Sequence, residues 1–184
     1  MKIMCAETLW ENDVSSSRTS YKSILDSVVT ETGDTLSYFT FNTPQELDNL
    51  FSVFKKSKYD LFYLASHMRG GNITSGYRKE FTINVYDAIK RNKATLTNKV
   101  LHLSGCSSVS DANLDIDKVR KICKLRAVSG YMIDTDTTES AAMDLIYLTN
   151  LSRNGVTGLY KLLTKRYGCL VRISGFKIYD LKEV

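Results

Sequence analysis

The chain has 184 residues, of which 43% are hydrophobic and 24% are charged, and its formal net charge is +5. This composition can bury a full core, which excludes a disordered or fibrous chain, and the small net charge does not by itself indicate a nucleic-acid-binding protein. No apolar stretch approaches the roughly 18 residues of a membrane span, and the first residues lack the apolar run of a secretory signal. We therefore expect one domain over residues 1–184, with no membrane partner.

The cysteines are far apart in the sequence and form no C-x-x-C pair. They are Cys5, Cys106, Cys123 and Cys169. Together with the lack of a secretory signal, this spacing predicts reduced thiols and a cytoplasmic location. The chain has 2 histidines, so the clustered Cys and His ligands of a zinc site are not expected. We expect no metal and no other cofactor.

Basic residues gather in two stretches, residues 120–126 and 161–166. Acidic residues are interspersed elsewhere, so we interpret both stretches as solvated helix faces rather than as phosphate-binding patches. No nucleic-acid partner is expected.

Apolar runs alternate with amphipathic segments along the whole chain. The predicted strands cover residues 2–6, 36–41, 60–66, 99–105, 126–133 and 169–179. The predicted helices cover residues 15–32, a segment from Thr43-Pro44 onward, 83–91, 115–124, 138–151 and 156–167. Thr43 and Glu46 have the spacing of a capping box, and a glycine-rich loop is predicted at residues 70–76. This order predicts an α/β fold with about six strands in a mostly parallel sheet and helices on both faces.

Polar residues follow three of these strands at the point where each strand ends. His67 follows residues 60–66, Cys106 follows residues 99–105, and Asp134 and Asp136 follow residues 126–133. In an open parallel sheet, sites form at the carboxyl ends of strands, and neighbouring strands lie about 4.8 Å apart. If the strands before His67 and Cys106 are neighbours, the imidazole can reach the thiol. A nucleophilic cysteine needs such a partner, because the thiolate is the reactive form.

Each of these residues also has a structural interpretation. A cysteine after an apolar strand is often a small buried hydrophobic group, and an isolated histidine is often only a hydrogen-bonding group. His67 and Cys106 taken together, each at a strand end beside Gly or Ser, favour catalysis. His102 lies inside its strand and is interpreted as structural, and the other three cysteines are interpreted as core residues.

Other signatures fit poorly. Ala112 stands six positions after Cys106, where a phosphatase loop has Arg, and Ser104 and Ser108 stand where a nucleophile elbow has Gly. Neither a Walker loop nor a G-x-G-x-x-G fingerprint is present.

The segments DLFYLASH and VLHLSGCSS, with His67 39 residues before Cys106, are followed by AVSGYMIDTDTTESAAMDLIYLTNLSRNG. This series resembles the caspase-like clan of cysteine peptidases, in which the His follows one strand and the Cys follows the next. The third segment is most similar to CHAT domains, where an aromatic residue, a hydrophobic residue and one or two Asp precede an apolar helix that ends in Gly. The likeness covers about residues 59–155 and implies a three-layer caspase-like fold.

The resemblance implies a cysteine endopeptidase that acts on a protein or peptide substrate. His67 would assist Cys106 in attacking the peptide carbonyl. Backbone N–H groups near Cys106 and in the loop of Met68, Gly70 and Gly71 would hold the oxyanion.

The resemblance also gives Asp134 or Asp136 a role in binding a basic side chain before the scissile bond. An equal alternative is that the aspartate caps the helix that starts near Thr138. Because caspase-like domains often belong to signalling or defence assemblies, a regulatory protein partner is expected.

Two departures from the pattern leave alternatives. The clan usually has His-Gly where this chain has His67-Met68, and caspases have Gln-Ala-Cys where this chain has Ser104-Gly105-Cys106. The first departure motivates an alternative function, a catalytically inactive caspase-like domain that acts as a protein-interaction module. A third hypothesis is a small-ligand binder that cradles an anionic group on Gly70-Gly71.

Overall fold

The computed structural model of the chain contains a central six-stranded sheet. In spatial order the strands are β2 (Thr35–Thr40), β1 (Lys2–Glu7), β3 (Leu61–Ala65), β7 (Val100–Ser104), β8 (Ala127–Tyr131) and β9 (Phe176–Asp180). All neighbours pair in parallel except β9, which is antiparallel to β8. The structure describes residues 1–8, 20–56, 58–74, 82–93, 96–110 and 116–180. The predicted mostly parallel α/β sheet is confirmed.

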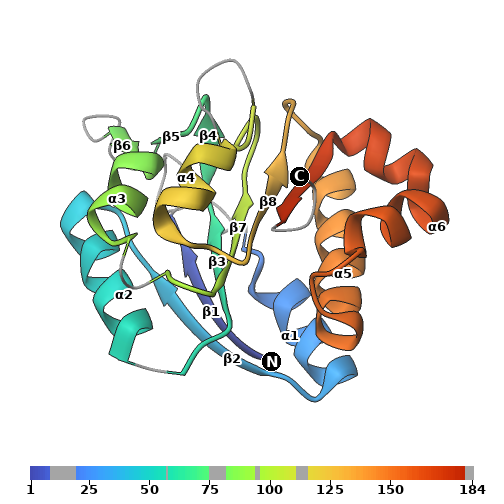
Figure 1. Ribbon diagram of the computed structural model, residues 1–184, viewed down its shortest axis with the longest axis horizontal. Helices are drawn as coiled ribbons and strands as arrows, with labels where there is room; N and C mark the ends of the chain where they lie inside the picture. Colours follow the sequence, from blue (N-terminus) through green and yellow to red (C-terminus); the bar gives the residue numbers. More distant parts are fainter. Residues whose placement is uncertain (9–19, 57, 75–81, 94–95, 111–115, 181–184) are drawn as a thin grey trace, which may run out of the picture.

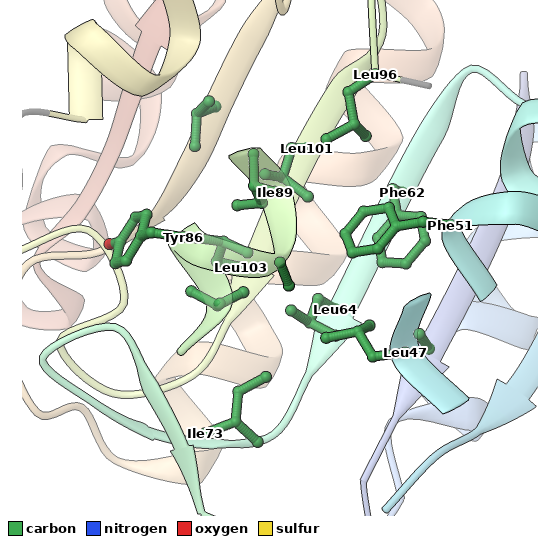
Figure 2. Close-up of a cluster of buried hydrophobic side chains, with 14 of the residues drawn as sticks. Leu47, Phe51, Phe62, Leu64, Ile73, Tyr86, Ile89, Leu96, Leu101 and Leu103 are labelled. Carbon is green, nitrogen blue, oxygen red and sulfur yellow. The ribbon is translucent and has the colours of Figure 1, made fainter. Parts of the chain in front are cut away.

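Helices cover both faces of this sheet (Figure 1). One face packs against α2 (Pro44–Lys56), α3 (Val85–Arg91) and α4 (Ile116–Cys123), and the other against α1 (Lys22–Thr32), α5 (Thr137–Asn154) and α6 (Leu159–Ser174). In β3, Phe62 and Leu64 belong to the first core, shown in Figure 2, while Leu61 and Tyr63 belong to the second. Burial on both faces explains the continuous apolar run of this strand. Across the described residues, no helix is long and apolar enough to cross a membrane.

Local sequence signals set the ends of the first two helices. The hydroxyl of Thr43 accepts from the Glu46 N–H at 3.2 Å, and the Glu46 carboxylate accepts from the Thr43 N–H at 3.1 Å, which is the predicted capping box. Helix α1 begins at Lys22, later than predicted, and residues 15–17 lie outside the described residues. It ends at Gly33, whose φ of 72° suits a glycine.

The prediction of a strand at residues 169–179 is wrong for most of that segment. Helix α6 continues to Ser174 through a bend at Tyr167, and Gly175, with φ of 64°, ends it. The apolar residues after Gly168 have the composition of a strand, but as a helix they bury Val171 in the second core. Tertiary packing therefore overrides the local preference, and β9 begins only at Phe176.

A small second sheet follows β3 and is absent from the sequence prediction. It contains β4 (His67–Arg69), β5 (Asn72–Thr74) and β6 (Thr82–Asn84) in antiparallel order. Gly70 and Gly71, with φ of 57° and 77°, form a two-residue turn where a longer loop is predicted. Position 76 of that predicted loop lies outside the described residues.

The predicted helix at 83–91 starts later than expected, because Thr82–Asn84 belongs to β6. The side chain of Asn84 caps α3 by accepting from the N–H groups of Tyr86 and Asp87 at 3.1 and 3.0 Å.

Candidate active site

The strands before His67 and Cys106 end side by side. β3 and β7 pair in parallel, and Ala65 opposite Ser104 is their last pair. His67 and Cys106 each stand two residues beyond this pair, at the same edge of the sheet. The adjacency on which the dyad hypothesis depends is therefore present.

Gly105 allows these two strand ends to approach closely. A Cβ at this position would lie 2.5 Å from the Ser66 carbonyl oxygen and 2.7 Å from Cγ of Met68. Both distances are too short for a real side chain. The residues on either side of His67 thus contact the residue directly before Cys106.

The His67 side chain is exposed at the start of β4, and Cys106 is half-buried. Sγ of Cys106 lies 3.7 Å from the Thr135 carbonyl oxygen, the geometry of a weak S–H donor. Both side chains can therefore be reached from solvent at the same sheet edge.

One candidate oxyanion donor is the backbone N–H of Cys106. The N–H groups of Gly105 and Ser107 donate to backbone carbonyls at 3.1 and 2.9 Å. For the N–H of Cys106, by contrast, the described part of the chain offers no acceptor. It can donate to an incoming group without breaking an existing hydrogen bond.

A second candidate donor is the backbone N–H of Met68. Met68 pairs with Ile73, one step from the turn between Arg69 and Asn72. The residues that flank a two-residue turn, here Arg69 and Asn72, form a hydrogen-bonded pair, and along an antiparallel ladder such pairs alternate with pairs that are not hydrogen-bonded. Met68 and Ile73 are therefore a pair without hydrogen bonds, and the N–H of Met68 points away from β5. The Met68 side chain is only 4% exposed and packs in the first core against Gly105.

An open polar cavity of about 540 Å³ lies between the β4–β5 hairpin and the loop after Cys106. It is lined by Arg69, Gly70, Asn72, Asn84, Ser107, Ser110 and Asp134. The Ser107 hydroxyl donates to the Asp134 carboxylate at 2.6 Å. One wall therefore carries an oriented negative charge, and Arg69 adds a positive charge elsewhere on the lining.

The structure separates the two candidate aspartates. Asp134 lines the cavity, whereas Asp136 caps α5 by accepting from the Thr138 N–H at 2.7 Å. The helix-capping interpretation therefore holds for Asp136. Of the two glycines of the turn, Gly70 lines the cavity and Gly71 packs in the interior.

Tyr86 connects the segments that follow the two strands, and sequence reasoning missed it. Its ring packs against Gly71, where any Cβ would overlap it, and its hydroxyl donates to the Ser108 carbonyl. Figure 2 shows Tyr86 at one end of the first core with its hydroxyl oxygen pointing away from the cluster. Burial raises the pKa of Tyr86, so its hydroxyl remains a donor. An aromatic residue near a helix start carries no signal for this role.

A separate group of polar side chains is buried on the other face of the sheet, around Asp144 of α5. This carboxylate accepts hydrogen bonds from His102 at 2.9 Å, from Ser104 and Tyr63 at 2.6 Å, and from Tyr131. Burial alone would raise the pKa of Asp144, but the attraction and hydrogen bond of His102, with the hydroxyl donors, hold it below its ordinary value. His102 also contacts Ser129 through its other ring nitrogen at 2.9 Å, which matches its structural interpretation.

All four cysteines are free thiols. Cys5 and Cys123 are buried as predicted, but the core interpretation of Cys169 is wrong, because it lies exposed on α6. Within the described ranges, no three His, Cys, Asp or Glu side chains come together in a way that would hold a metal ion.

The six-stranded sheet has this strand order, helices cover both of its faces, and a His and a Cys follow neighbouring strands. These features together define a caspase-like α/β protein. The structure is similar to that of pro-Sf-caspase-1, with a TM-score of 0.58 and 12% identity over 98% of this chain and 90% of that chain. It is also similar to the Drosophila initiator caspase Dronc, with a TM-score of 0.59 and 12% identity over 98% and 79% of the two chains. These similarities confirm the caspase-like fold.

The chain itself belongs to a family of unknown function (DUF6642), whose sequence model matches residues 1–180. A search of curated protein sequences found no match. The specific likeness to CHAT domains stays a prediction from the sequence.

Proposed function

We propose that the chain is a cysteine endopeptidase with a dyad of His67 and Cys106. The observation that carries the proposal is the parallel pairing of β3 and β7, after which His67 and Cys106 each follow at the same offset. The caspase-like fold supports it, because caspases are cysteine peptidases. Among caspase-like proteins, the segment from Tyr131 to Gly155 favours the CHAT domains as relatives.

In the proposed reaction, His67 removes the thiol proton of Cys106, and the sulfur attacks the carbonyl carbon of a peptide bond. His67 then passes the proton to the leaving amine, and water hydrolyses the thioester that remains on Cys106. The N–H groups of Cys106 and Met68 hold the negative oxygen formed during attack. Loss of one such donor typically lowers the rate by about 10²–10³.

Asp134 supports a preference for a basic side chain before the scissile bond. Its carboxylate lines the cavity next to Ser107, the residue directly after Cys106. A Lys or Arg side chain in this cavity would form a charge-assisted hydrogen bond with it. Arg69 lines the same cavity and repels a cation, so we expect it to restrict this preference.

The test is covalent labelling by peptide acyloxymethyl ketones with Arg, Lys, Asp or Leu at the reactive position. We expect Cys106 to react with the Arg and Lys reagents, and both Cys106→Ala and His67→Ala to abolish labelling. Asp134→Asn should remove the preference for basic reagents, and Arg69→Ala should strengthen it. Asp136→Asn is the matched control, since Asp136 caps α5 away from the cavity lining.

Cys169 provides an internal control, because it is an exposed thiol of the same chain. A dyad makes Cys106 react far faster than Cys169, and only while His67 is present. Equal labelling of the two cysteines, unchanged by His67→Ala, would contradict the peptidase proposal.

A second candidate function is a protein-interaction module without catalysis. The observation that favours it is Met68, which replaces the usual Gly after the His and is buried in the core. This function predicts unchanged partner binding in Cys106→Ala. For both functions we expect a regulatory protein partner and, since the cysteines are free thiols, the cytoplasm as the compartment.

A further inference from the structure

Helix α6 and strand β9 border a groove of about 420 Å³, and none of the described residues that line it carries a carboxylate. The apolar walls of the groove come from three parts of the chain: Tyr160 and Val171 of α6, Met132 after β8, and Phe176 of β9. Val171 and Phe176 are almost fully buried and form its base. Gly168 also lines the groove, and a Cβ there would meet no atom within 4 Å, so space is open above it. The groove is large enough for a few apolar side chains.

The charged residues exposed on α6 are all cations. Its exposed cations are Lys161, Lys165, Arg166 and Arg172, and the helix contains no Asp or Glu. None of the four forms an ion pair with any residue that the structure describes. On α4, by contrast, Asp117 pairs with both basic side chains of the last turn.

Helix stability explains only part of this charge pattern. Arg172 stands in the last turn, where a cation interacts favourably with the helix dipole. Lys161 stands in the first turn, where a cation is unfavourable, and it lies four residues before Lys165, a repulsive spacing for like charges. The charges of these two lysines therefore do not stabilise the helix.

Lys177 brings a further cation to the groove itself. Its Nζ lies 4.7 Å from the ring centre of Tyr160 and 5.9 Å from that of Tyr179. The aromatic faces hold the ammonium group at the groove without neutralising its charge. Ile133, which is 46% exposed, packs beside Gly175 at one end of the groove, so apolar surface continues outward from it.

We propose that this groove, together with the cations of α6 and Lys177, is a docking surface for an acidic segment of a partner protein that also carries apolar side chains. Carboxylates of the segment would pair with the cations, and its apolar side chains would fill the groove. A second copy of this chain would bring like charges together, which disfavours self-association through this face. The docking surface does not depend on the chemistry proposed for Cys106.

The shape of the site separates a peptide from other polyanions. A bilayer presents a flat surface, and a nucleic-acid backbone presents phosphates at regular spacing, so neither one fills an apolar groove. A peptide can place carboxylates and apolar side chains at alternate positions. Its carboxylates can then face the cations while its apolar side chains enter the groove beside them. Charge complementarity and apolar shape thus favour the same occupant.

The test begins with selection of phage-displayed random peptides on the full chain. We expect enrichment of sequences that combine Asp or Glu with Leu, Ile, Met or Phe, and binding of a fluorescent synthetic copy measured by anisotropy. The double variant Arg172→Glu and Lys177→Glu should weaken this binding by about tenfold or more. Gly168→Met, which fills the open space of the groove, should weaken it while leaving every charge in place.

The matched control is the double variant Lys55→Glu and Lys56→Glu, which reverses two exposed cations in the last turn of α2. It should change the peptide affinity by less than about twofold. Enrichment of neutral or basic peptides, or equal loss of binding in the control variant, would overturn the proposal. Single-stranded DNA and vesicles with anionic lipid should be weaker competitors of the fluorescent peptide than the unlabelled peptide is. If either competes as strongly, the surface binds any polyanion and the proposal is overturned.

Discussion

Two polar regions of this protein share strands β3 and β7 and differ in almost every other respect. Around Asp144, the polar side chains are buried, and both ring nitrogens of His102 have hydrogen-bond partners. Beyond the ends of β3 and β7, His67 is exposed, Cys106 is half-buried, and the Cys106 N–H finds no acceptor among the described residues. A buried polar group must be satisfied by the fold itself, whereas one beyond a strand end remains available to a substrate. The two histidines therefore stand in different environments, one enclosed by the fold and one exposed at the sheet edge.

The largest expected effect comes from removing the centre of the buried region. Asp144→Ala removes the acceptor of His102 and of the buried Tyr63 and Ser104 hydroxyls, while Tyr131 keeps the Ser140 carbonyl, so we expect a loss of about 3–5 kcal/mol in the free energy of unfolding. Urea denaturation followed by far-UV circular dichroism measures it. Asp136→Ala, which removes only the exposed cap of α5, should cost about 1 kcal/mol. Similar losses in both variants would contradict a structural role specific to the buried region.

The buried region should also control stability in acid. The pKa of Asp144 is held below its ordinary value in the folded protein, so the unfolded chain binds a proton more readily. The stability that this group contributes is therefore complete above the pKa of the unfolded chain and is lost as the pH falls through the folded-state pKa. Urea denaturation from about pH 6 to about pH 3 should show a smaller loss in Asp144→Asn than in the wild type. Identical pH profiles would contradict this prediction.

A smaller effect is expected at the open edge. Tyr86→Phe removes the hydrogen bond to the Ser108 carbonyl but keeps the ring that packs on Gly71, so the loss should be about 1 kcal/mol. Because this bond holds the loop after Cys106, the rate of Cys106 alkylation by iodoacetamide should change as well. Tyr160→Phe, which removes a hydroxyl in the α6 groove, is the matched control and should leave that rate unchanged. An unaltered alkylation rate in Tyr86→Phe would show that the Tyr86 hydroxyl does not influence Cys106.

The parts of the molecule that could be predicted depend on local or repeating signals. The apolar runs of β3 and β7 predict buried parallel strands, and the rule for strand ends then places His67 and Cys106 at one edge. The Thr43–Glu46 capping box is local as well. These signals need no knowledge of which distant residues meet.

The parts that could not be predicted depend on contacts between distant segments. Asp144 is one acidic residue in an apolar helix until the fold brings the side chains of three strands to it. The packing of Tyr86 on Gly71 depends on where α3 meets the hairpin. The second half of α6 has a strand-like composition, and only its burial against the second core decides that it is a helix.

Gly71 and Gly105 are held as glycine by different constraints. The space beside Gly71 is filled by the ring of Tyr86, and its φ of 77° is strained for any other residue, so a smaller residue at 86 alone does not admit a side chain at 71. The space beside Gly105 is closed by the backbone oxygen of Ser66, which no substitution removes. In descendants of this sequence, position 71 is therefore expected to stay glycine even where position 86 changes, as long as the turn keeps its backbone conformation, while position 105 stays glycine as long as the two strand ends remain joined.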